Sequence, residues 1–266
     1  MELISVIIPT WNRSEVIQKA IMSALNQTYS KVEVLVCDDG STDYTQQIVE
    51  SIPDPRLKWI PGVRSGRPAI PRNRGIRESQ GQWLAFLDSD DEWLPNKLDQ
   101  QLSRAKKTGC KAVSTNAYRL FPERGIVGTM LGIERAKLSF KDMLDQNSVI
   151  CSSALLHHSL LDIVLGFPEE PDLKVCEDYA FWLRIATQTE IAFVFKPLVI
   201  YQDDAQHSVR GLVNRSVWEE RKVLFRNFLY WSVSAKISEK YITEARAQYN
   251  RAIQKLQQLE ELDIFW

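Results

Sequence analysis

The chain of 266 residues lacks an excess of charge of either sign. It carries 33 Lys and Arg residues against 34 Asp and Glu residues, which gives a formal net charge of −1 at pH 7. A strongly basic surface is the electrostatic footprint of nucleic-acid binding, so this balance argues against a nucleic-acid partner. A ligand therefore has to be recognised at a local site.

Cysteines are few, and no two of them lie close together in the sequence. They stand at Cys37, Cys110, Cys151 and Cys176, without any Cys-x-x-Cys spacing. This pattern argues against a structural zinc site and against a disulfide framework. We expect four buried free thiols in a protein of a reducing compartment, the cytoplasm.

Long apolar runs are also missing. No window reaches the roughly 18 apolar residues that a membrane-spanning helix requires, and residues 1–9 are too short and too acidic for a signal peptide. With 44% hydrophobic residues the chain can nevertheless build a substantial core. The composition predicts a folded protein that is soluble or at most peripheral to a membrane.

What the sequence does contain is an alternation of strand and helix patterns. Residues 3–9 form a nearly continuous apolar run, as in a strand buried on both faces, and apolar residues at helical spacing follow it. The same alternation recurs, which predicts an α/β fold with a doubly wound, mostly parallel, Rossmann-like sheet. We expect strands at 32–37, 57–60, 83–87, 111–118 and 152–156, a helix at 179–186, paired strands within 191–201, and helices from about residue 213 onward.

Three polar loops follow predicted strands at the edge of the sheet where doubly wound folds bind ligands. The third loop holds Asp88 and Asp90, whose carboxylates can both reach one cation at the end of a buried strand. Hard divalent ions take a few carboxylate oxygens and complete their shell with phosphates, so this pattern favours a clamp for a nucleotide diphosphate. An acidic turn in solvent is the alternative.

The second polar loop holds Asp38 and Asp39. From this position an acidic side chain can bind a ribose hydroxyl or a base N–H, and capping of the next helix is the alternative. Arg67, Arg72 and Asn73 are predicted to face the same edge of the sheet. We expect them either to neutralise phosphate charge or to fix neighbouring loops.

Four segments carry a resemblance to a known family. They read SVIIPTWNR (5–13), ALNQTYSKVEVLVCDDGSTD (24–43), RNRGIRESQGQWLAFLDSDDEWLPNKL (72–98) and CEDYAFWLRIA (176–186). In this order and spacing they resemble glycosyltransferase family 2, the inverting nucleotide-sugar transferases of GT-A fold. The resemblance implies a GT-A domain at 1–210, with a nucleotide-sugar-binding half at 1–118 and an acceptor and catalytic-base half at 119–210. Residues 211–266 would form a C-terminal helical extension.

The resemblance also implies a nucleotide-sugar site. Trp11 stands where the family usually has Tyr, Asp39 would accept a hydrogen bond from the base, typically uracil, and Asp88 and Ser89 would approach the ribose. The implied site consists of Pro9, Thr10, Trp11, Asp39, Arg67, Asn73, Asp88 and Ser89.

A metal ion and a catalytic base complete what the resemblance implies. Asp90 would bind Mn²⁺ or Mg²⁺, and His207 would be a further ligand, although Asp203 or Asp204 can fill that place instead. Asp178 would be the general base, because the start of a helix keeps a carboxylate ionised. Helix capping is the alternative role for Asp178.

The predicted C-terminal helices carry an apolar stripe next to basic residues. The stripe predicts either contact with a membrane surface near a lipid-linked acceptor, or packing against the catalytic domain or a second subunit of an oligomer. Its apolar members are Leu224, Phe225, Phe228, Leu229 and Trp231, and its basic members are Arg221, Lys222 and Arg226.

Together these patterns predict a metal-assisted glycosyltransferase of the hexosyltransferase type. It would move a sugar from a nucleoside-diphosphate sugar, such as a UDP-sugar, to a hydroxyl of a sugar or lipid-linked acceptor in polysaccharide, cell-envelope glycan or glycolipid synthesis. We expect it in the cytoplasm or at the inner face of the membrane. The alternatives are an inactive sugar-nucleotide-binding scaffold and a phosphohydrolase of the haloacid dehalogenase type, which also places Asp-x-Asp after a strand.

Overall fold

The structure, a computed structural model, describes residues 1–204 and 215–263. Its first part alternates strands and helices as predicted, and the four strands pair in parallel in the order β3-β2-β1-β4. Apolar β-branched runs form these strands because both of their faces are covered by helices. The elements are β1 (Ile4–Thr10), α1 (Ile17–Leu25), β2 (Val32–Asp38), α2 (Thr45–Glu50), β3 (Leu57–Ile60), α3 (Ala69–Glu78) and β4 (Trp83–Phe86).

The second part extends the same sheet. Its strands and α-helices are β5 (Glu92–Trp93), α4 (Lys97–Thr108), β6 (Ala112–Phe121), β7 (Gly125–Thr129), β8 (Lys137–Leu138), α5 (Phe140–Asp145), β9 (Leu155–His157), α6 (Leu161–Val164), α7 (Glu177–Ala186), β10 (Ile191–Gln202), α8 (Val217–Ser234) and α9 (Glu239–Asp263). Three short 3-10 turns lie between them, at η1 (Cys151–Ser153), η2 (His158–Leu160) and η3 (Pro171–Leu173).

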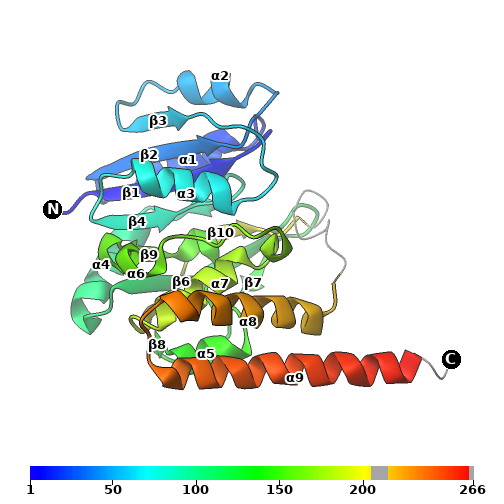
Figure 1. The fold of residues 1–266 in the computed structure, drawn as a ribbon. Coiled ribbons are helices and arrows are strands. Elements are labelled where there is room, and N and C mark those ends of the chain that lie inside the picture. Colours follow the sequence, from blue (N-terminus) through cyan, green and yellow to red (C-terminus); the bar gives the residue numbers. More distant parts are fainter. Residues whose placement is uncertain (205–214, 264–266) are drawn as a thin grey trace.

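The sheet has the order β3-β2-β1-β4-β9-β6-β10-β5, with β7 and β8 on its flanks. The strand β9 runs antiparallel to both β4 and β6, while β6 and β10 pair in parallel. The prediction of a doubly wound, mostly parallel sheet is confirmed. Figure 1 shows this sheet running from β3 at one end of the molecule towards the C-terminal helices at the other.

Helices bury both faces of the sheet. Ile7 and Phe86 point into a core that contains side chains of α3, α5, α7, α8 and α9. Val6 and Ile8, their neighbours in the sequence, point into a second core with α1 and α4. This alternation along a strand explains why the run at 3–9 has no polar period.

Two details of the predicted strands are wrong. Residues 191–201 form the single strand β10 instead of a pair, and its register against β6 shifts on either side of Pro197. Proline cannot donate to the ladder, so an irregularity within one strand looks like a break between two strands in the sequence. The strand expected at 152–156 is the turn η1 followed by the short strand β9.

The C-terminal part is helical, as predicted, and α8 and α9 lie side by side in Figure 1. A capping box of Ser216 and Glu219 starts α8. The apolar stripe of α8 is buried against the catalytic core at Leu224, Phe225, Phe228 and Trp231. Of the two explanations for this stripe, packing against the domain holds for these four residues. No helix in 1–204 or 215–263 combines the length and the apolar character needed to span a bilayer.

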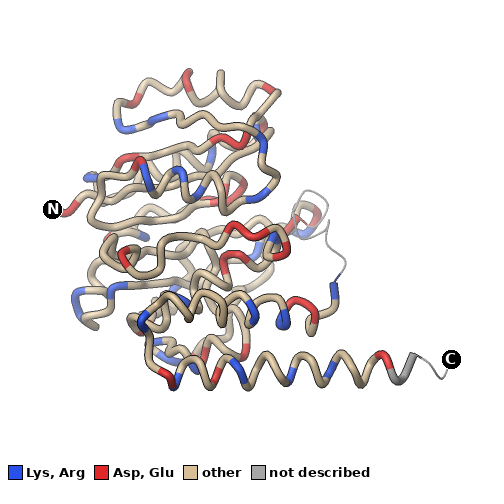
Figure 2. Tube along the Cα trace, viewed as in Figure 1, with Lys and Arg blue, Asp and Glu red and all other residues tan. Residues whose placement is uncertain are grey.

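Charges and cysteines follow the sequence predictions. Figure 2 shows Lys and Arg interspersed with Asp and Glu over the described elements, without one continuous basic face. All four cysteines are free and buried, as expected.

Candidate active site

A hollow of about 670 Å³ opens where strands of the parallel part of the sheet end. Residues from the loops after β1, β2, β3 and β4 meet there with the start of α7 and the end of β10. This is the edge at which the sequence predicted a ligand. The predicted site residues that line this hollow are Pro9, Thr10, Trp11, Asp39, Arg67, Asp88, Ser89, Asp90 and Asp178.

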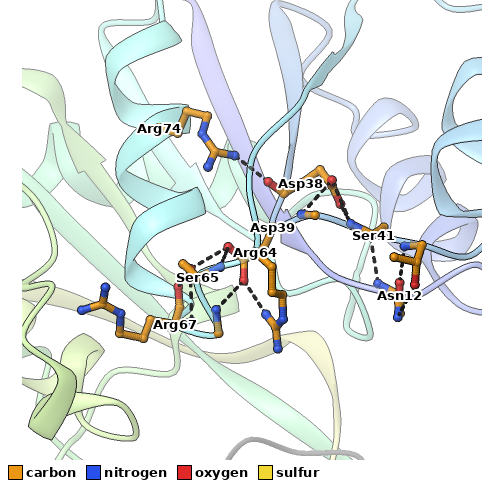
Figure 3. A network of polar contacts seen from close by, with 11 residues as sticks. Asn12, Asp38, Asp39, Ser41, Arg64, Ser65, Arg67 and Arg74 are labelled. Atoms are coloured by element: carbon orange, nitrogen blue, oxygen red, sulfur yellow. Dashed lines mark hydrogen bonds and ion pairs between the residues drawn. The ribbon is translucent and has the colours of Figure 1, made fainter.

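Asp39 holds the loop that follows β3 (Figure 3). One carboxylate oxygen accepts hydrogen bonds from the backbone N–H and the hydroxyl of Ser65, at 3.0 and 2.6 Å. The other accepts from the N–H of Gly66 at 2.9 Å and forms an ion pair with Arg64. A carboxylate has about four acceptor positions, so this set occupies all of them. Reading a base through Asp39 therefore requires one of these donors to withdraw.

Asp38, the other acid of this pair, supports its own loop. Its carboxylate accepts from the N–H groups of Gly40 and Ser41, and its backbone carbonyl accepts from Arg74 (Figure 3). Asn12 connects the loop after β1 to the same region, because its N–H donates to the Ser41 hydroxyl at 2.9 Å. Asp38 is thus a loop-building residue, and Asp39 is the one that faces the hollow.

Trp11 forms a flat apolar wall of the hollow. Its side chain is 41% exposed, and the Arg64 guanidinium lies 3.6 Å from the ring centroid. The hydroxyl of Thr10 is buried in the same wall and has no hydrogen-bond partner in the described part of the chain. An aromatic face beside an orphaned hydroxyl suits a planar ligand with polar edges, such as a nucleobase.

The acidic loop after β4 separates into three different environments. Asp88 pairs with Arg72 at 2.7 Å, and Asp90 lies 3.9 Å from Arg13. Asp91 is almost fully buried and accepts from Ser152 and from the N–H of Gln202, so it ties this loop to η1 and β10. Asp91 is therefore structural, although the sequence groups it with the other acids.

Partial burial, together with the charges of Asp88 and Asp204, raises the pKa of Asp90, and the charge of Arg13 opposes this shift. Carboxylates that raise one another's pKa form a site that a divalent cation would stabilise. No group of three ligating side chains occurs in residues 1–204 and 215–263. One carboxylate ligand still fits Mg²⁺ or Mn²⁺, because such ions take most of their remaining ligands from phosphates and water. The other predicted ligand, His207, lies outside the described residues.

Asp178 stands at the first turn of α7, half-buried at the inner end of the hollow. Burial raises its pKa, while the Arg72 charge and the Tyr179 N–H lower it. Its carboxylate also accepts from Asn147 at 3.3 Å. A raised pKa in a carboxylate that remains accessible from a hollow is a property of general bases.

Two predicted nucleotide contacts are placed differently from one another. Arg67 lines the hollow and donates to the carbonyl of Glu169. Asn73 is not among the lining residues, because its amide is fully engaged with the backbone of Phe167 and the side chain of Glu169. It lines a second hollow of about 650 Å³ on the outer side of α3. The structure thus favours a loop-fixing role for Asn73.

Sequence reasoning missed several residues that line the site. Arg64 follows β3 and could have been found from the rule that ligands bind at the carboxyl ends of strands. Lys174 and Asn147 lie in loops without a readable motif, so no sequence signal pointed to them. Arg13 was part of a quoted loop, but its approach to Asp90 depends on how two loops fold together.

Comparisons with known proteins agree with this geometry. The model of the family described as "Glycosyl transferase family 2" matches residues 5–162. An Escherichia coli protein, UDP-Glc:alpha-D-GlcNAc-diphosphoundecaprenol beta-1,3-glucosyltransferase WfgD, is 33% identical over 192 residues, which are 72% of this chain and 73% of that protein. The putative teichuronic acid biosynthesis glycosyltransferase TuaG of Bacillus subtilis is 29% identical over 69% of this chain and 71% of its own.

A solved structure shares the fold. The crystal structure of S. aureus TarS 1–349 in complex with UDP-GlcNAc has a TM-score of 0.75 and 21% identity, and covers 95% of this chain and 72% of that one. This likeness confirms the GT-A fold. Membership of a transferase family also leaves no support for the phosphohydrolase alternative or for a purely structural role. The chain is a glycosyltransferase and belongs to glycosyl transferase family 2.

Proposed function

We propose that the protein is an inverting glycosyltransferase that moves a sugar from a UDP-sugar to a hydroxyl of a lipid-linked glycan acceptor. The observation that carries this proposal is the gathering of Asp39, Asp90 and Asp178 around one hollow. Two relatives from Escherichia coli are named for the use of UDP-Glc and a diphosphoundecaprenol-linked sugar, which supports both the donor and the acceptor class.

The donor would occupy the side of the hollow built by the loops after β1, β2 and β4. Trp11 and Thr10 would contact the base, and Asp88 and Ser89 would approach the ribose. Asp39 would accept from the base after exchanging one of its loop contacts, and Arg67 would face the nucleotide from the rim. A divalent ion at Asp90, Mn²⁺ or Mg²⁺, would stabilise the charge that develops on the leaving diphosphate.

The acceptor would enter on the side of α7. Asp178 would take the proton of the acceptor hydroxyl while the hydroxyl oxygen attacks the anomeric carbon, opposite to the bond that breaks. A single displacement of this kind inverts the anomeric configuration. In this proposal residues 1–118 form the donor half, 119–210 the acceptor and base half, and 211–266 a helical extension.

A lipid-linked acceptor would bring the protein to the inner face of a membrane as a peripheral enzyme of the cytoplasm. The apolar stripe of α8 cannot supply that contact, because its main residues are buried in the core. Peripheral contact would need other surfaces, and an oligomer remains a further prediction.

Asp178→Asn tests the proposal. The variant should lose transfer from UDP-sugars to a diphosphate-linked N-acetylglucosamine acceptor, yet bind UDP as the wild type does. Asp172→Asn is the matched control, because Asp172 pairs with Arg226 and does not line the hollow. Nuclear magnetic resonance of the product should show an inverted anomeric centre. Full activity of Asp178→Asn, or retention of configuration, would exclude the mechanism.

A further inference from the structure

Arg72 is enclosed between two acidic side chains that come from distant parts of the sequence. From α3, its Nη1 donates to Glu177 Oε1 at 2.8 Å and its Nη2 donates to Asp88 Oδ1 at 2.7 Å. The side chain is only 6% exposed, and the ring of Phe167 covers it at 5.3 Å. One guanidinium therefore joins α3, the loop after β4 and the first turn of α7.

These contacts decide between the two roles that the sequence left open for Arg72. Both Nη groups are committed to carboxylates, and Nε is buried without a partner in the described part of the chain. No donor of Arg72 is left to bind a phosphate. A planar guanidinium with two fixed carboxylates also sets their separation and orientation, which a flexible ammonium group cannot do.

The same guanidinium acts on the proposed base. Its charge is the largest influence that lowers the pKa of Asp178, against burial and the charge of Asp88, which raise it. Burial raises the pKa of Glu177, the neighbour of Asp178, to about 7, and Arg72 opposes that shift as well. The other titratable groups close to Asp178 are the buried thiols of Cys151 and Cys176, whose raised pKa keeps them neutral.

We propose that Arg72 is a positioning residue of the transfer reaction: it fixes the donor-binding loop relative to α7 and supplies the positive charge that faces Asp178. It would act through Asp88 and Glu177 without touching either substrate. Because the same side chain contacts both halves of the site, it also makes the geometry of the base depend on the geometry of the donor loop. This inference rests on the proposed function of Asp178 as general base.

The test is the pH profile of kcat/KM at saturating metal for Arg72→Met and Arg72→Lys. Loss of the charge in Arg72→Met raises the pKa of the base, so the acidic limb should move to higher pH by about 1 unit or more. Activity at neutral pH should then fall at least about tenfold and recover in part at higher pH. Arg72→Lys keeps the charge and should shift the limb less, while its kcat still falls because one ammonium cannot bridge both carboxylates.

Breaking a buried ion pair can also unfold the protein. The variant Glu177→Gln avoids this problem, because its amide oxygen can still accept from Arg72 and its shape is unchanged. It removes a negative charge next to Asp178, so the acidic limb should move to lower pH, opposite to the shift in Arg72→Met. A limb that stays at the wild-type pH in Glu177→Gln, with transfer intact, would overturn the proposal even if Arg72→Met does not fold.

Failure of this inference can be told apart from failure of the proposed function. If Asp178 is not the base, Asp178→Asn transfers sugar and no acidic limb can be assigned to it. If Asp178 is the base but Arg72 only holds the fold, Asp178→Asn is inactive while Glu177→Gln and the folded Arg72 variants keep the wild-type limb.

Discussion

The contacts of Asp39 lead to a quantitative prediction for Asp39→Asn. The substitution replaces one of two oxygens by an NH₂ group, which then faces donors of the loop that follows β3 instead of accepting from them. It also removes the ion pair with Arg64. A hydrogen bond to a charged group contributes about 1.5–3 kcal/mol, and since Arg64 is 43% exposed, solvent screening favours the lower end of that range.

We therefore expect UDP to bind Asp39→Asn about 10- to 100-fold more weakly, because the loop that shapes the nucleotide side of the hollow is released. Isothermal titration calorimetry with and without Mn²⁺ measures this directly. Asp43→Asn is the control. Asp43 lies in the same loop after β2 and accepts from Ser14 and Thr45, but it does not line the hollow. Equal UDP affinities for the two variants would refute the reasoning.

Three further outcomes are expected. The contacts of Asp43 lower its pKa to about 2, so its contribution to stability is present above about pH 4 and is lost as the pH falls towards 2. Acid unfolding followed by circular dichroism should show about 1 kcal/mol less pH dependence in Asp43→Asn. Phe228→Ala should cost about 3–5 kcal/mol in urea unfolding, because Phe228 is 1% exposed, whereas Tyr230→Ala on the same helix, at 71% exposure, should change stability by about 0.5 kcal/mol or less. Chelation of divalent ions, or Asp90→Asn, should abolish transfer while leaving the fold unchanged, and activity that survives EDTA would exclude a metal-dependent mechanism.

The fold was largely predictable because its signals are local. The run at 3–9, the helical spacing that follows it and the turn residues between them are set by short-range patterns, and the structure confirms the strands and helices of the first part. The strand β10 was misread because the effect of Pro197 depends on its partner β6, which lies some 80 residues earlier in the chain. Residues 120–150 gave no prediction, since the short elements β7, β8 and α5 are held mainly by tertiary contacts.

The site was predictable as a set of carboxylates, but not as a set of partners. An acidic residue after a strand has the same appearance in the sequence whether it binds a ligand or supports a loop. The structure separates the two cases by what each carboxylate accepts from: Asp91 is enclosed by Ser152 and Gln202, whereas Asp90 lies 3.9 Å from Arg13, beyond direct hydrogen-bond distance. Among the acids of this loop, the least engaged one is therefore the better candidate for an exchangeable cation.

The same reasoning connects the two ends of the hollow. Asp39 and Asp88 are each held by an arginine from another loop, Arg64 and Arg72, so the donor side is stabilised by cations of the chain itself. A nucleotide that binds there has to compete with Arg64, which is exposed, and not with Arg72, which is buried. Donor binding should thus rearrange the rim while it leaves the bridge between Asp88 and Glu177 in place, so that Asp178 keeps its position throughout the reaction.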